Sequence, residues 1–193
     1  SILPDEVDKE TIGLRFRGRD PQAPWRTHHE AIVSSKEVIK EVNESYGKTF
    51  GRKYGNGLTE QYRCEDAEAI MVAMGSIAGT ARAAVDRLME DGKKVGLVKL
   101  KCYLPFPVED FQEYGKKFGA IGMIDRNICL GHGGAGFRLI RNALYELDER
   151  PAVLQYHAGL GGKEVMVKDI VKVGEKILSA AKGEKVAPLV EWV

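Results

Sequence analysis

Three glycine-bearing segments of this 193-residue chain carry residue types that could hold a ligand. The first covers residues 75–80, contains Gly75, Ser76 and Gly79, and follows an apolar run of strand length. Glycine permits a tight strand-to-helix turn, and the free amides at a helix start can hold an anion. Alternatively, the turn is purely structural and Ser76 caps the helix. The spacing does not match the G-x-G-x-x-G pattern of dinucleotide-binding turns.

The second segment begins with Asp125, Arg126 and Asn127 and continues into residues 131–136, where four of six positions are glycine. Arg126 offers a fixed cation with bidentate geometry, and the glycines allow close backbone approach. The run lacks the Gly-Lys-Ser/Thr ending of a P-loop. Ligand binding, a subunit contact and a flexible turn all fit this composition. We expect residues 126–136 to form a contact surface whose glycines add nothing to the domain's own core.

The third segment runs from His157 to Lys163 and could meet an acidic group or form a solvated connection. No histidine has a second ligand at metal-binding spacing, and no pair of carboxylates stands out for acid–base catalysis. We therefore assign no catalytic and no metal-binding residue. The candidate ligand-binding residues of the first two segments are Gly75, Ser76, Arg126, Gly131, His132, Gly133 and Gly134.

The cysteines are three in number and far apart: Cys64, Cys102 and Cys129. None belongs to a C-x-x-C pair, so this chain alone provides neither an iron–sulfur cluster nor a structural zinc site. We expect Cys102 and Cys129 to be small buried hydrophobic residues at or beside strands.

The charge balance, 29 basic against 28 acidic residues, gives no global reason to expect nucleic-acid binding. No apolar run reaches the roughly 18 residues of a membrane helix. The amino end also shows no apolar core of a signal peptide. We expect a soluble, cytoplasmic protein without nucleic-acid or membrane partners.

Three regions are expected from the sequence pattern: an extended arm over residues 1–28, a helix and linker over 29–58, and an α/β domain over 59–193. Strand-like runs alternate with amphipathic segments of helical length, which predicts βαβ units and a mostly parallel sheet. The expected fold is a three-layer α/β/α sandwich with about five strands. The expected strands lie near residues 62–65, 69–74, 95–103, 120–124 and 152–156.

Taken together, these segments resemble the second domain of alpha subunits of pyruvate:ferredoxin oxidoreductases, which belong to the 2-oxoacid:acceptor oxidoreductases. The resemblance covers roughly residues 29–178. It rests on KEVIKEVNE at 36–44, FGRKYG at 50–55, YRCEDA at 62–67, VAMGS at 72–76, VGL at 95–97, PFP at 105–107, DRN at 125–127, GHGGAG at 131–136 and AGLGG at 158–162.

The resemblance implies a domain similar to the carboxy-terminal domain of transketolases. It also implies a complex that decarboxylates pyruvate or a related 2-oxoacid with coenzyme A, giving acetyl-CoA, carbon dioxide and reduced ferredoxin. Thiamine pyrophosphate, Mg²⁺ and [4Fe-4S] clusters belong to the full complex and none is expected in this chain. The implied partners are a thiamine-binding beta subunit, a ferredoxin-like delta subunit, a gamma subunit and, through the complex, ferredoxin.

The amino-terminal thiamine domain of such subunits has no counterpart in the sequence, so we transfer no catalytic residue. This chain is expected to serve assembly and the shaping of the active-site surroundings, and to be inactive alone. The alternatives are an independent small-molecule or nucleotide-binding α/β module and a non-catalytic interaction subunit.

We predict that the purified chain contains no iron, no acid-labile sulfide and no flavin. A [4Fe-4S] cluster normally needs four thiolates, and only three scattered cysteines are present. Iron and sulfide analysis, together with a visible absorption spectrum, tests this directly. A stoichiometric cluster in the isolated chain would contradict it.

Overall fold

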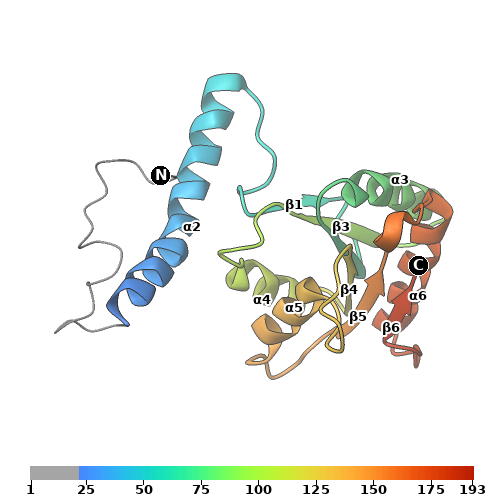
Figure 1. Cartoon of the computed structure of the whole chain (residues 1–193). Coiled ribbons are helices and arrows are strands. Elements are labelled where there is room, and N and C mark those ends of the chain that lie inside the picture. The colour runs from blue at the N-terminus through green and yellow to red at the C-terminus, as the bar shows by residue number, and fades with distance from the viewer. Residues whose placement is uncertain (1–21) are drawn as a thin grey trace. The chain divides into compact units, whose positions relative to one another are not determined.

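The computed structural model describes residues 22–193, which are coloured in Figure 1. The chain divides into two compact units, residues 1–35 and residues 36–193. The first described element is helix α2 (Ala23–Phe50), which crosses this boundary. It begins at Ala23 and not near His29, so residues 23–28 are helical. Pro24 is compatible with that early start because proline is tolerated in the first helical turn. The remainder of the expected arm lies outside the described residues.

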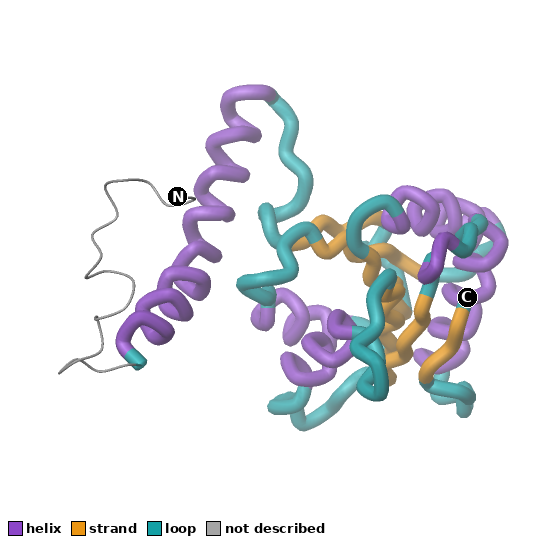
Figure 2. The backbone as a smooth tube through the Cα atoms, in the orientation of Figure 1, coloured by secondary structure: helices purple, strands orange, loops and turns teal. Residues whose placement is uncertain are grey.

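Strands and helices alternate after α2 (Figures 1 and 2). The strands are β1 (Thr59–Tyr62), β2 (Ala69–Ala73), β3 (Val95–Leu100), β4 (Ala120–Asp125), β5 (Ala152–His157) and β6 (Val190–Trp192). The helices are α3 (Ile77–Glu90), α4 (Val108–Lys117), α5 (Ala135–Leu144) and α6 (Val167–Ala181), with a 3₁₀ turn η1 (Leu160–Gly162) before α6.

Within residues 22–193 the strands form one six-stranded sheet in the order β1-β3-β2-β4-β5-β6. The edge strand β1 is antiparallel to β3, and the other neighbours are parallel. Helices α3 and α6 cover one face of the sheet, and α4 and α5 cover the other. The expected three-layer α/β/α sandwich is therefore confirmed, with six strands where about five were expected.

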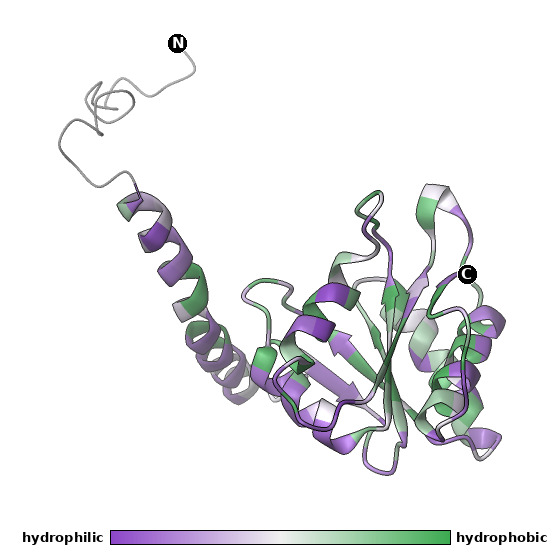
Figure 3. Cartoon of the chain, turned by 90° about the horizontal axis from the view of Figure 1, so that it is seen from below, coloured by the Kyte–Doolittle hydropathy of each residue, from purple (hydrophilic) through white to green (hydrophobic). Residues whose placement is uncertain are grey.

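Each central strand contributes side chains to both hydrophobic cores. Along β2, Met71 packs toward α3 and α6, whereas Ile70 and Val72 pack toward α4 and α5. This alternation follows from the two-residue period of a strand, and it requires a continuous apolar sequence because both faces are covered. Figure 3 shows the result as predominantly hydrophobic central strands. Burying each large side chain contributes about 1.5–3 kcal/mol, so the two cores supply most of the stabilising free energy.

The first strand differs from its expected position at residues 62–65, because its buried residues are polar. Thr59 is 2% exposed, and its hydroxyl donates to Asp110 at 2.7 Å and lies 2.9 Å from the Tyr114 hydroxyl. Glu60 is also buried and forms an ion pair with Arg82. Hydrophobic patterning does not detect a strand whose buried positions are polar and partnered.

The order of the strands reverses at the carboxyl ends of β2 and β4. These strands are neighbours, yet the chain leaves β2 for α3 on one face and leaves β4 for α5 on the opposite face. Open α/β sheets place ligand-binding loops at this reversal of strand order. Two of the glycine-bearing segments follow these two strands and therefore meet there.

Replacing Gly96 with alanine should lower the free energy of unfolding by about 1–3 kcal/mol. A β-carbon at this position in β3 would lie 2.7 Å from the sulfur of Cys64 and 2.9 Å from the backbone oxygen of Arg63. Backbone atoms cannot turn away as a flexible side chain can. Urea unfolding followed by circular dichroism measures the change.

The matched control is Gly79→Ala in α3, where an added β-carbon meets nothing within 4 Å. This variant should be more stable than the parent chain by about 0.4–1 kcal/mol, because alanine restricts the unfolded chain. Equal effects of the two substitutions would contradict the packing described for Gly96.

Candidate functional site

Ser76 and Arg126 meet at the carboxyl edge of β2 and β4. Ser76 immediately precedes α3, and Arg126 directly follows β4. A guanidinium nitrogen of Arg126 lies 3.4 Å from the Ser76 hydroxyl oxygen, and both residues are exposed. Gly75 has a positive φ of 68° and turns the chain into the helix. A cation, a hydroxyl and a helix amino end at one edge are suited to contact with an anionic group.

The Ser76 side chain makes no hydrogen bond to the backbone amides that begin α3. The Ser76 side chain therefore does not cap α3, which was the alternative role expected for it. Instead, the hydroxyl faces the Arg126 guanidinium. The structure thus brings together two of the candidate residues that are fifty positions apart in the chain.

Asp125 is the buried acidic residue beneath this edge, at the last position of β4. It is fully buried, and its carboxylate accepts hydrogen bonds from the backbone N–H groups of Gly136 at 3.2 Å and Phe137 at 3.1 Å. The Asn127 amide donates to the same carboxylate at 3.2 Å. Asp125 thereby satisfies the free amides at the amino end of α5, although it lies ten residues earlier in the chain.

The pKa of the Asp125 carboxyl is raised, because burial disfavours its charged form. The N–H groups of Phe137 and Gly136 and the side chain of Asn127 act in the opposite direction. His157, which pairs with Asp125 across β4 and β5, also opposes the rise. Desolvation is the largest of these effects, so the neutral carboxyl is favoured more than in water.

Gly134, just before α5, and Gly136, in its first turn, pack against this buried acid. A β-carbon on Gly134 would overlap the carboxylate of Asp125 and the side-chain amide of Gln155, and one on Gly136 would meet the sulfur-bearing end of Met123. Gly133 has a φ of 88°, and a β-carbon added there would lie 3.0 Å from the Gln155 amide oxygen. The expectation that these glycines add nothing to the core was wrong, because they allow the loop to close directly over Asp125 and Gln155.

A second buried polar pair lies beside Asp125 at the end of β5. The Gln155 amide nitrogen is 3.0 Å from the Nε2 atom of His157, and both side chains are buried. The His157 ring also packs on Trp192 of β6, with 4.8 Å between ring centroids. Its Nδ1 atom has no hydrogen-bond partner among the described residues. Sequence reasoning placed His157 in a loop, because the pairing of β5 with the three-residue β6 was not expected.

The remaining candidates, Gly131 and His132, are exposed in the loop between β4 and α5. Their loop is closed by backbone pairing of Cys129 with Gly133, including a 2.9 Å bond from the Cys129 N–H to the Gly133 carbonyl. His132 faces a surface pocket along α5 and is not part of the Ser76–Arg126 pair. The seven candidate residues therefore divide between two places.

Two expectations for the cysteines were wrong. Cys129 is exposed and Cys102 is only half-buried, because both lie in loops after their strands have ended. Cys64 is the buried one, and its thiol donates to the Leu97 carbonyl at 3.3 Å. Burial raises the pKa of the Cys64 thiol. This thiol is therefore a packing residue and a poor nucleophile.

Residues 22–193 contain no group of three or more histidine, cysteine or acidic side chains that could bind a metal ion. In the same range no helix has the length and hydropathy needed to cross a bilayer. The described residues therefore do not fit an iron–sulfur cluster or a bound divalent cation. The expectation that this chain carries no cofactor stays a prediction.

Asp125→Asn should lower the free energy of unfolding by about 1–3 kcal/mol, because one of the two backbone N–H donors at α5 loses its acceptor. The effect should depend on pH. Since the folded pKa of Asp125 lies above the unfolded value of about 3.9, the native state retains a proton that the unfolded state releases. The resulting stabilisation is complete below about pH 4 and is lost as pH rises through the folded pKa.

The stability advantage of the parent chain over Asp125→Asn should therefore shrink as the pH rises above about 4 and through the folded pKa. Urea unfolding of both proteins at a series of pH values measures this difference, and groups common to both cancel. An advantage that grows with pH would show that the acid is held mainly as a stabilised carboxylate.

Comparison with known proteins identifies the family of this chain. Residues 67–170, more than half of the chain, match the model of the pyruvate:ferredoxin oxidoreductase core domain II. This match covers the strands and loops from β2 to β5, which carry Ser76, Arg126 and the buried Asp125.

Three curated relatives illustrate the similarity. Pyruvate synthase subunit PorA of Pyrococcus horikoshii is 40% identical over 167 residues, covering 85% of this chain and 41% of that protein. PorA of Methanocaldococcus jannaschii is 39% identical over 143 residues, covering 73% and 36%. Ketoisovalerate oxidoreductase subunit VorA of P. horikoshii is 35% identical over 167 residues, covering 86% and 41%. The chain thus matches about two fifths of the length of these relatives.

Among solved structures, a split-gene transketolase in an inactive β4 tetramer resembles this chain with a TM-score of 0.54. The sequences are 19% identical, and the match covers 67% of this chain and 44% of the transketolase chain. This likeness supports the fold alone. Together with the family match over residues 67–170, it agrees with the arrangement derived above. The chain belongs to the pyruvate:ferredoxin oxidoreductase core domain II family.

Proposed function

We propose that this chain serves as the second core domain of the alpha subunit of a 2-oxoacid:ferredoxin oxidoreductase. The observation that carries the proposal is its family membership over residues 67–170, together with 35–40% identity to PorA and VorA subunits. The complete complex would decarboxylate a 2-oxoacid oxidatively with coenzyme A and pass the electrons to ferredoxin. Pyruvate is the proposed substrate, because PorA subunits are named for pyruvate synthase.

Catalytic chemistry in this proposal belongs to other parts of the complex. Thiamine pyrophosphate with Mg²⁺ and [4Fe-4S] clusters would be held outside this domain, because its described residues lack a ligand set for them. The partners would be the thiamine-binding, gamma and ferredoxin-like subunits. We therefore assign no catalytic step to a residue of this chain.

The domain's own contribution would be to hold surfaces in fixed positions for its partners. The two covered faces of the sheet make the body of the domain rigid, and Asp125 fixes the start of α5 through two backbone hydrogen bonds. At the same edge, Ser76 and Arg126 are exposed and free to approach another molecule. We propose this pair as a contact for an anionic group of a partner or substrate.

The alternative of an independent small-molecule module also depends on Ser76 and Arg126. Such a module would hold an anionic ligand at this edge without help from other subunits. The two functions differ in what the isolated chain does, because only the independent module needs no partner to bind its ligand.

Coexpression of this chain with the thiamine-binding, gamma and ferredoxin-like subunits should give a complex that reduces ferredoxin when pyruvate and coenzyme A are supplied. The chain alone, with added thiamine pyrophosphate and Mg²⁺, should show no turnover, since it matches only about two fifths of its relatives' length. Ferredoxin reduction followed by absorbance tests both statements. Turnover by the chain alone, or an assembled complex inactive with every 2-oxoacid tried, would refute the proposal.

A further inference from the structure

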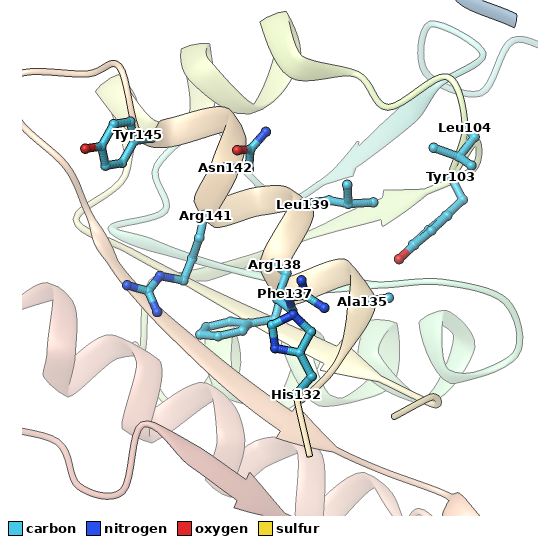
Figure 4. Close-up of a pocket in the computed structure, with 10 residues that line it drawn as sticks. All are labelled: Tyr103, Leu104, His132, Ala135, Phe137, Arg138, Leu139, Arg141, Asn142 and Tyr145. Carbon is cyan, nitrogen blue, oxygen red and sulfur yellow. The ribbon is translucent and has the colours of Figure 1, made fainter. Parts of the chain in front are cut away.

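A pocket of about 770 Å³ lies along α5 (Figure 4), and neither Ser76 nor Arg126 lines it. Its walls come from three segments that are far apart in the sequence. The loop after β3 contributes Tyr103 and Leu104, the loop after β4 contributes His132, and α5 contributes its outward-facing side chains. The family assignment and the proposed function leave this pocket without a role.

The pocket carries positive charge without an internal counter-charge. Arg138 and Arg141 project from successive turns of α5 and are both exposed, and His132 stands beside them (Figure 4). None of the ten lining residues is an aspartate, a glutamate or a lysine. The Arg141 guanidinium lies over the ring of Phe137, 5.5 Å from its centroid, which holds its charge at the pocket wall. An anionic group is therefore the complementary occupant.

A buried hydroxyl group adds a hydrogen-bond donor to this wall. The Tyr103 hydroxyl is shielded from solvent and has no hydrogen-bond partner among the described residues. Burial raises the pKa of this phenol, with the Asp125 carboxylate acting in the same direction, so Tyr103 stays protonated at neutral pH. A buried donor without a partner costs about 1–3 kcal/mol. A carboxylate brought into the pocket would remove that cost.

The rim of the pocket favours a polypeptide over a small molecule. Leu104 is 63% exposed and Tyr145 is 68% exposed, and both line the pocket. Small-molecule sites bury most of their ligand in a concave pocket, whereas large exposed apolar side chains around a basic centre are typical of protein interfaces. Tyrosine and arginine anchors with no lysine, aspartate or glutamate also match the composition of interface hot spots.

We propose that this pocket docks a segment of another subunit that presents a carboxylate beside an apolar or aromatic side chain. The carboxylate pairs with Arg138 or Arg141, and the apolar side chain packs against Leu104 and Tyr145. This docking rests on the proposed function, because a multisubunit oxidoreductase supplies the second polypeptide. It also gives the exposed α5 surface a partner of defined chemistry.

Zero-length cross-linking in the assembled complex tests this contact. Arg138→Lys and Arg141→Lys keep the positive charge and introduce an amine that a carbodiimide joins to a touching carboxylate. Mass spectrometry should find at least one of these positions linked to an aspartate or glutamate of a different polypeptide. Arg87→Lys is the matched control: Arg87 is an exposed arginine on α3, on the opposite face of the sheet, and should give no such link.

Charge reversal supplies a second measurement. The double variant Arg138→Glu, Arg141→Glu should weaken association of this chain with the other subunits at least about tenfold, whereas Arg87→Glu should leave it unchanged. Circular dichroism shows whether the helical fold survives, as expected for exposed positions. Full assembly of the double variant, or links only to this chain's own sequence, would overturn the proposal. So would normal assembly combined with lost binding of coenzyme A, which would identify a small-molecule site.

Ferredoxin reduction by the complex, measured beside the cross-linking of its lysine variants, separates this proposal from the proposed function. Links from position 138 or 141 in a complex that reduces no ferredoxin would support the docking contact and remove the proposed function. A complex that reduces ferredoxin, shows no link and is insensitive to charge reversal would support the proposed function and contradict the docking contact.

Discussion

The structure depends on burying both faces of one largely parallel sheet. Side chains of β2 and β4 alternate between two hydrophobic cores, so neither helix pair could be removed without exposing half of every central strand. The chain must therefore place helices on both faces, and it leaves β2 for α3 on one face and the neighbouring β4 for α5 on the other. That reversal brings Ser76 and Arg126 together without any local sequence signal linking them. The geometry of the edge follows from the requirement to cover the sheet.

The same edge includes a buried acid whose burial is unfavourable by itself. Asp125 offsets this cost by accepting the free N–H groups at the start of α5, which would otherwise have no helical partner. Close approach of the loop then excludes side chains at Gly134 and Gly136. The glycine-rich run is thus explained by packing over a carboxylate. Its exposed part is limited to the tip near Gly131 and His132.

Apolar runs were sufficient to locate β2, β4 and β5, and their alternation with amphipathic segments predicted helices between the strands, because these elements are buried by hydrophobic side chains. Neither signal locates a strand that is stabilised by polar contacts or by pairing with a neighbouring strand. The strand β1 buries Thr59 and Glu60, and β6 is defined by its register with β5. For the site, strand-end reasoning identified Ser76 and Arg126. The Gln155–His157 pair and the pocket on α5 depend on tertiary neighbours that no local pattern encodes.

These two polar regions differ in how firmly they are held. Asp125, Gln155 and His157 are buried and partnered, so they fix the backbone beneath the edge. Arg138 and Arg141 are exposed on a helix whose amino end is held by that buried acid. A charge on a well-anchored helix loses little conformational freedom when a partner binds, which lowers the cost of association. The buried network therefore supports the surface chemistry: by fixing the start of α5, Asp125 also fixes the direction in which the two arginines face a partner.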